Sequence, residues 1–162
     1  MSNALARVAL ESNLSSYYVG EVGTRPWGHF KVIGAGIDQT GQEFCEKEIT
    51  VNPGQILSLQ SHNFRGEKWT VLEGELIVVL DGERYDLKEG ESIVIPLRAI
   101  HCMANGSNKP CVVYEKQLGL CSEDDIIRYV DMYGRAGADL DSKSAASVEL
   151  FNLVLSEIRK AA

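Results

Sequence analysis

The sequence predicts an all-β domain, a sandwich or barrel of antiparallel strands with a short helical extension at each end. The middle of the chain carries short apolar runs separated by turns rich in Gly, Asn, Asp and Pro. This pattern indicates about eight strands over roughly 100 residues. The two ends show helical periodicity instead. We therefore divide the chain into residues 1–16, 17–121 and 122–162.

The first two segments carry their own start and stop signals. In residues 1–16, Leu5, Val8 and Ser12 fall at helical spacing, which predicts a short helix. In the strand-rich middle, Asp81-Gly82 separates the apolar run LIVVL from RYDL and predicts a tight hairpin.

Two helices are predicted in the last segment. SEDDIIRYVDMYG has Ser122 as an N-cap, acidic residues in its first turn and Gly134 at its end. A linker of small residues follows, and then an amphipathic helix with basic residues near its C-terminus. The apolar stripe of this second helix consists of Val148, Phe151, Val154, Leu155 and Ile158.

Composition limits the classes of partner. The 162 residues carry a net charge of −7 and contain no basic block, so we expect neither a nucleic acid nor a membrane partner. No signal peptide or membrane span is recognised, and none of the four cysteines forms a CxxC pair. We therefore expect a reduced, cytoplasmic protein.

Two polar clusters carry the chemistry. In the first, strand alternation places Gln60 and His62 on one face, and a bend before Glu67 starts a new strand. Neighbouring strands could thus aim these three side chains at one point. In the second cluster, a proline turn at Pro96 precedes a strand that carries His101.

The spacing of these clusters resembles the paired motifs of the cupin superfamily. The first motif is matched by Gly54, Gln60, His62, Glu67 and Gly74, and the second by Gly90, Pro96, His101 and Asn105. The resemblance implies a cupin double-stranded β-helix, which is a jelly-roll barrel.

Four longer segments resemble one branch of cupins, the type II mannose-6-phosphate isomerases, over roughly residues 24–136. They are RPWGHF, VNPGQILSLQSHNFRGEKWTVLEGE, GESIVIPLRAIH and SEDDIIRYVDMYGR. That domain also forms the C-terminal part of bifunctional mannose-1-phosphate guanylyltransferase/isomerase enzymes. In this branch a glutamine stands at the first ligand position, where Gln60 stands here.

The resemblance implies a metal site formed by Gln60, His62, Glu67 and His101. Two imidazoles, a carboxylate and an amide oxygen suit a divalent first-row metal. We expect one such ion, zinc in the first place, with manganese, iron, cobalt or nickel as alternatives. A metal of this kind polarises a sugar carbonyl and stabilises an enediolate.

The implied activity is aldose–ketose isomerisation of a sugar phosphate through a cis-enediol, most like mannose 6-phosphate to fructose 6-phosphate. Lys47 lies among apolar residues on one strand face and is therefore one candidate for proton transfer. Glu67 is the other candidate. Arg65 is the expected substrate anchor, with Arg25 and Arg135 as further phosphate-binding candidates.

Some residues depart from the family pattern. The family is commonly histidine-rich where Asn63 and Phe64 stand, it has glycine in place of Arg98, and it often has a basic residue in place of Ile100. These departures favour an alternative, a non-catalytic metal cupin that binds a sugar or sugar phosphate as a sensor or accessory module. A metal-dependent dioxygenase is disfavoured. Such cupins usually bind iron through three histidines, whereas this chain has three histidines in all and one of them, His29, belongs to another motif.

Strand alternation also predicts what lies outside the barrel. If Gln60 and His62 face inward, Leu57 and Leu59 face outward and need a cover. A terminal helix or a second subunit could provide that cover, and we expect a homodimer.

Overall fold

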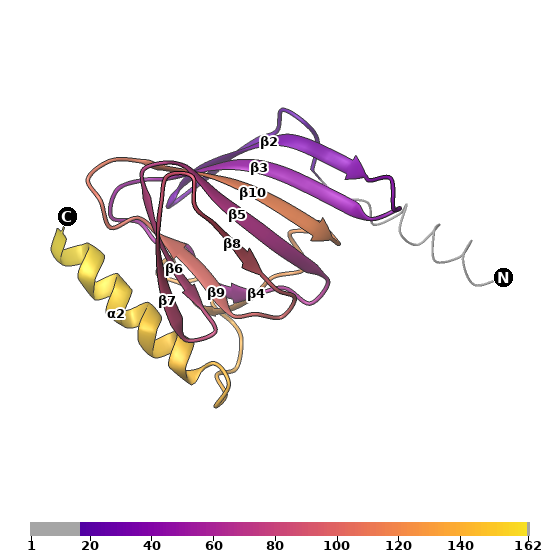
Figure 1. Ribbon diagram of the computed structural model, residues 1–162. Helices are drawn as coiled ribbons and strands as arrows, with labels where there is room; N and C mark the ends of the chain where they lie inside the picture. The colour runs from indigo at the N-terminus through magenta and orange to yellow at the C-terminus, as the bar shows by residue number, and fades with distance from the viewer. Residues whose placement is uncertain (1–16, 162) are drawn as a thin grey trace.

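The computed structural model describes residues 17–161, which form two antiparallel sheets facing each other (Figure 1). The six-stranded sheet has the order β1-β2-β3-β10-β5-β8, and the five-stranded sheet has the order β11-β4-β9-β6-β7. The predicted all-β architecture is therefore confirmed. The helix predicted for residues 1–16 lies outside the described residues.

The strands of the six-stranded sheet are β1 (Val22–Arg25), β2 (Gly28–Ile37), β3 (Glu43–Val51), β5 (Arg65–Glu73), β8 (Ser92–Ile95) and β10 (Cys111–Gly119). Those of the five-stranded sheet are β4 (Leu59–Ser61), β6 (Glu75–Leu80), β7 (Glu83–Lys88), β9 (His101–Ala104) and β11 (Ile127–Val130). The estimate of about eight strands was too low, because several strands have only three or four residues.

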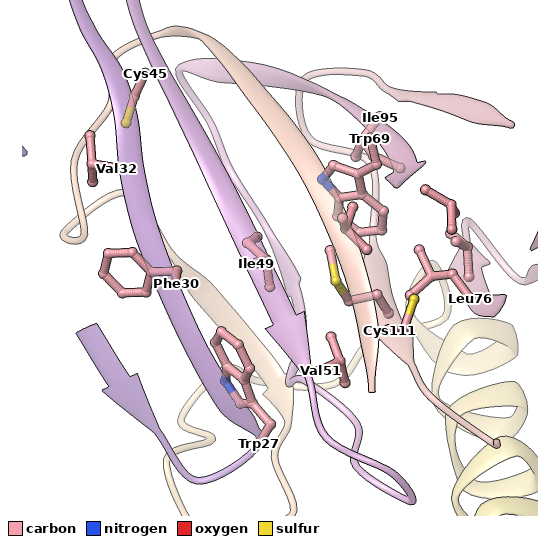
Figure 2. Packing of buried hydrophobic residues seen from close by; sticks show 14 of the residues in the cluster. Trp27, Phe30, Val32, Cys45, Ile49, Val51, Trp69, Leu76, Ile95 and Cys111 are labelled. Carbon is pink, nitrogen blue, oxygen red and sulfur yellow. The ribbon is translucent and has the colours of Figure 1, made fainter. Parts of the chain in front are cut away.

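The main core fills the space between the sheets. Strand β3 shows why, since Cys45, Lys47, Ile49 and Val51 are all buried and the residues between them are half-buried or exposed. This alternation is that of a strand with one face turned to a core. Figure 2 shows Phe30, Ile49 and Trp69 of the six-stranded sheet and Trp27 of the turn between β1 and β2. Leu76 of the five-stranded sheet belongs to the same cluster.

The predicted hairpin is confirmed. Leu80 pairs with Glu83 across the two-residue turn, and Asp81 and Gly82 have φ angles of 47° and 81°. Two consecutive left-handed residues match the right-handed twist of the flanking strands, and this requirement favours Asp-Gly.

A second core lies on the outer face of the five-stranded sheet, under the helix α2 (Ala145–Ala161) (Figure 1). Ser144 precedes the helix, and its backbone N–H bonds to the Asp141 carboxylate. The predicted apolar stripe is confirmed, with Phe151, Val154 and Ile158 fully covered.

The two leucines predicted to share the outer face are separated. Leu59 is buried under α2, which provides the predicted cover. Leu57 packs instead against the inner core, so its predicted outward orientation was wrong. The reason is that β4 begins at Leu59, and strand alternation does not extend back to Leu57.

The helix predicted from Ser122 to Gly134 is also wrong. The segment forms a turn and then β11, which pairs antiparallel with β4. Residues 126, 127 and 130 are β-branched and suit a strand. Pairing also satisfies an edge of β4 that would otherwise stay open, and this tertiary gain outweighs the helix-start signals.

Two further observations concern the predicted compartment. All four cysteines are buried thiols without a disulfide. Among residues 17–161, no helix combines the length and the apolar character that crossing a membrane requires. A cytoplasmic location stays a prediction.

Candidate metal centre

His62, Glu67 and His101 form a buried cluster between the two sheets. Each offers one ligand atom, and the three atoms lie within 4.8 Å of one another. His62 follows β4 directly and His101 opens β9, whereas Glu67 comes from β5. The strands that carry Gln60 and Glu67 were predicted to be neighbours. They belong instead to opposite sheets, so the cluster closes across the barrel.

Backbone carbonyls fix the tautomers of both histidines. His62 Nδ1 lies 2.6 Å from the Asp125 carbonyl, and His101 Nδ1 lies 2.8 Å from the Ala99 carbonyl. Since a carbonyl only accepts, each Nδ1 carries a proton, and in the neutral imidazole Nε2 is then the nitrogen that holds the lone pair. Burial lowers the pKa of His101 to about 4, so its imidazole is neutral at neutral pH.

The remaining geometry fits a metal cation. His101 Nε2 is buried and has no hydrogen-bond partner among the described residues. His62 Nε2 lies 3.1 Å from Glu67 Oε1, and two acceptor atoms at this distance require a proton or a cation between them. Neutral imidazoles that donate through Nδ1 to a second shell are the usual form of metal-binding histidine.

Glu67 is held as a carboxylate. Burial alone would raise its pKa, but contacts with His62 and the Arg65 guanidinium lower it well below its usual range. Its two oxygens accept from Arg65 Nε at 3.0 Å and from Trp69 Nε1 at 2.9 Å. These bonds orient the carboxylate toward the two imidazoles.

Gln60 reaches the cluster through its amide nitrogen. Its Nε2 lies 3.4 Å from His62 Nε2, while its Oε1 accepts a hydrogen bond from Ser58 Oγ at 2.7 Å. As a metal ligand, Gln60 would present the oxygen, which requires the amide to turn over. Its predicted role as fourth ligand therefore stays a prediction.

A pocket opens beside the cluster. The space between its walls, open solvent at the mouth included, is about 530 Å³. Gln60 and Arg65 line it and also contact the buried triad. Lys47 lines it too, as expected for a lysine on the inner face of β3. The Lys47 ammonium lies 3.7 Å from the centre of the Tyr17 ring, a cation–π contact.

The three arginines predicted to bind substrate all line this pocket, and each has an acidic neighbour. Arg65 is paired with Glu67 and also donates to the Ser122 carbonyl. Arg135 is paired with Asp131 at 2.9 Å, and Arg25 lies 3.7 Å from Glu123.

Further pocket residues were missed by the sequence analysis, among them Glu115, Gln117, Glu123 and Arg128. The carboxyl of Glu115 is buried near Glu67, and burial together with that negative charge raises its pKa to about 8. Glu115 and Gln117 alternate with exposed or half-buried residues along β10, a signal of an inner face that the sequence did carry. Arg128 was hidden by the incorrect helix prediction.

The departures from the family pattern lie outside this pocket. Phe64 is exposed, and Ile100 packs in the outer core under α2. The backbone N–H groups of Asn63 and Phe64 both donate to the Asp125 carboxylate. Arg98 is exposed, with a φ of 63°, which explains why the pattern has glycine there.

Comparison with known families adds to this geometry. The family model described as mannose-6-phosphate isomerase C-terminal matches residues 13–131. The chain belongs to this family. The resemblance inferred from the motifs is therefore confirmed, and so is the mannose-6-phosphate isomerase type of cupin domain.

A curated relative of this family member is the mannose-1-phosphate guanylyltransferase of Escherichia coli strain K12. The two are 43% identical over 112 residues, which is 68% of this chain and 22% of the relative. The chain thus spans about a fifth of the length of that relative.

Two solved structures share the fold. The capsular polysaccharide assembling protein CapF from Staphylococcus aureus matches 70% of this chain and 34% of its own, with a TM-score of 0.59 and 16% identity. KdgF from Halomonas sp. matches 63% of this chain and 86% of its own, with a TM-score of 0.53 and 18% identity. The predicted cupin barrel is confirmed for this member of the mannose-6-phosphate isomerase C-terminal family.

Proposed function

We propose that this chain is a metal-dependent sugar-phosphate isomerase, most like one that interconverts mannose 6-phosphate and fructose 6-phosphate. One observation carries the proposal. In a member of the mannose-6-phosphate isomerase C-terminal family, two Nε2 lone pairs and the Glu67 carboxylate converge beside a pocket lined by cations.

In this proposal His62, Glu67 and His101 hold one divalent ion, with zinc as the first expectation, and Gln60 is the fourth ligand. When bound, the ion polarises the sugar carbonyl and stabilises the enediolate that forms on proton removal. Arg65 and Gln60 donate toward the His62 Nε2 lone pair at 3.3 and 3.4 Å, so both shift when this lone pair binds an ion.

Proton transfer is assigned to Lys47 and Glu115. Both oxygens of Glu67 already accept hydrogen bonds, and in this proposal the carboxylate serves as a metal ligand, while its role as a base stays a prediction. Lys47 and Glu115 are opposite residues on β3 and β10, and both side chains line the pocket. A paired acid and base on one pocket wall can move a proton between C1 and C2.

Metal content and isomerisation of mannose 6-phosphate, measured on the same preparation, test the proposal. Wild-type protein is expected to hold about one metal ion per chain and to turn over. His62→Ala is expected to lose both, because it removes one of the four proposed ligands. His29→Ala is the matched control, since His29 is an exposed histidine on β2 and is expected to leave both unchanged.

Solvent isotope exchange distinguishes the isomerase from the alternative, a non-catalytic sugar-phosphate binder. An isomerase that works through an enediol exchanges the hydrogen at C2 of the sugar phosphate with D₂O, whereas a binder exchanges none. Metal binding without turnover or exchange, across hexose and pentose phosphates, would replace the isomerase proposal with the binder. Wild-type protein without metal after reconstitution would refute both.

A further inference from the structure

Arg128 lies beside the candidate metal centre on the edge strand β11. It is the direct cross-strand partner of Gln60, and both residues line the pocket. Side chains of directly opposed residues leave the sheet on the same face, with Cβ atoms about 5 Å apart. The Arg128 side chain is therefore placed on the inner face next to Gln60.

The other cations of the pocket already have partners. Arg65 is paired with Glu67, Arg135 with Asp131, and Arg25 lies near Glu123. Lys47 is held against the rings of Tyr17 and Phe30.

Arg128 differs from these cations. Its Nε is buried and has no hydrogen-bond partner among the described residues. The charge of Arg128 acts on the nearby Asp131 carboxylate, but both oxygens of that carboxylate accept their hydrogen bonds from Arg135. A buried N–H without an acceptor is unfavourable and marks a place where a ligand acceptor is expected.

The position of Arg128 is fixed by its backbone. Its carbonyl accepts hydrogen bonds from the N–H groups of Gly137 and Ala138, and its strand is paired with β4. Arg128 thus lines the pocket from an anchored strand. A planar guanidinium binds phosphate oxygens through two parallel N–H bonds, which an ammonium cannot do.

We propose that Arg128 binds the phosphate group of the sugar phosphate at the β11 side of the pocket. This inference rests on the proposed function, because it assigns the phosphate subsite of that same pocket. The phosphate then lies beside Gln60, and the sugar extends toward Lys47 and Glu115 on the opposite sheet. Arg25 and Arg135, predicted from the sequence as phosphate ligands, have secondary roles.

Calorimetric titration of the full chain, loaded with zinc, tests this assignment with mannose 6-phosphate and with inorganic phosphate. Arg128→Gln is expected to weaken the binding of both ligands at least tenfold and to leave metal content unchanged. Arg128→Lys is expected to recover part of the affinity, since it restores the charge but not the planar pair of donors. Arg159→Gln removes the same charge from an exposed position on α2 and is expected to bind as wild type.

The assignment is overturned if Arg128→Gln binds either ligand within twofold of wild type, if wild type binds neither, or if the variant loses its metal. The isomerase proposal can be refuted separately from this phosphate subsite. A wild-type protein that binds mannose 6-phosphate through Arg128 but neither turns it over nor exchanges C2 hydrogen supports this subsite and refutes the isomerase.

Discussion

At the scale of single residues, the site depends on hydrogen bonds that the sequence does not display. The motifs identified His62, Glu67 and His101 as candidate ligands, and the structure brings these three together. Which imidazole nitrogen holds the proton is decided by the carbonyls of Asp125 and Ala99. Side-chain types and their spacing can be predicted from motifs, whereas a carbonyl acceptor comes from any residue type and leaves no sequence signal.

Arg98→Gly is expected to stabilise the fold by about 0.5–1 kcal/mol. A non-glycine residue in the left-handed region costs about 1–2 kcal/mol, and the added freedom of glycine in the unfolded chain offsets part of the gain. The hydrogen bond from the Arg98 backbone N–H to the His62 carbonyl is kept in the variant. Urea unfolding measures the difference, with Arg98→Ala as the control that keeps the strained backbone. A glycine variant less stable than the alanine variant would contradict the expectation.

Glu115 gives a pH-dependent prediction for the metal-free protein. Burial and the charge of Glu67 raise its pKa from 4.5 to about 8, so the folded state binds more protons than the unfolded state between these values. The contribution of Glu115 to the free energy of unfolding is therefore greatest at low pH. It falls as pH rises toward 8, by at most about 1.4 kcal/mol per pH unit.

Glu115→Gln is expected to remove this dependence. In thermal unfolding, the melting temperature of the variant relative to wild type should therefore rise from pH 5 to pH 8. The matched control is Glu48→Gln, which changes an exposed carboxylate on β3. Parallel stability profiles of wild type and Glu115→Gln would show that the Glu115 carboxyl ionises normally.

At the scale of elements, the strands and α2 followed from local patterns, whereas β11 did not. The alternation in β3 and the apolar stripe of α2 are properties of each segment alone. The segment of β11 has both helix-start signals and β-branched residues, and its pairing with β4 decides in favour of the strand. Pairing partners far apart in sequence are not visible in a local pattern, and Arg128 was missed for this reason.

Phe151→Ala is expected to destabilise the fold by about 3–5 kcal/mol, because it leaves a cavity in the outer core. Phe151 is fully buried against the sheet that carries Gln60 and His101. Leu153→Ala on the exposed face of the same helix is the control, expected within about 0.5 kcal/mol of wild type. Chemical denaturation measures both variants. Equal effects would show that α2 does not depend on its buried face.

At the scale of the whole molecule, the candidate ligands join the two sheets. Glu67 belongs to the six-stranded sheet, and the two histidines lie on the other side of the barrel. The fold class and the ligand types followed from turns and motif spacing, while the closure across the barrel needed the structure. The predicted homodimer stays a prediction, which sedimentation analysis can test. The argument for it was an uncovered apolar outer face, and that argument is weakened because α2 covers Leu59 and Leu57 turns inward.

Zinc is expected to stabilise the entire domain, because only the folded state brings the ligands together. At a hundredfold excess of metal over its dissociation constant, the gain is about 2.7 kcal/mol. Scanning calorimetry should show a higher melting temperature with zinc and reversal by a chelator. His29→Ala should retain this shift and His62→Ala should lose it. An unchanged melting temperature in wild type would argue against the metal centre.

The contacts of Asp125 set a limit on transplanting this site into another scaffold. All four candidate ligands precede residue 102, and a designer guided by motifs alone would cut the chain after the barrel strands. Such a cut discards the carbonyl that directs the His62 proton and the carboxylate that anchors Asn63 and Phe64. The smallest portable unit therefore extends at least through Asp125, although no candidate metal ligand lies beyond His101.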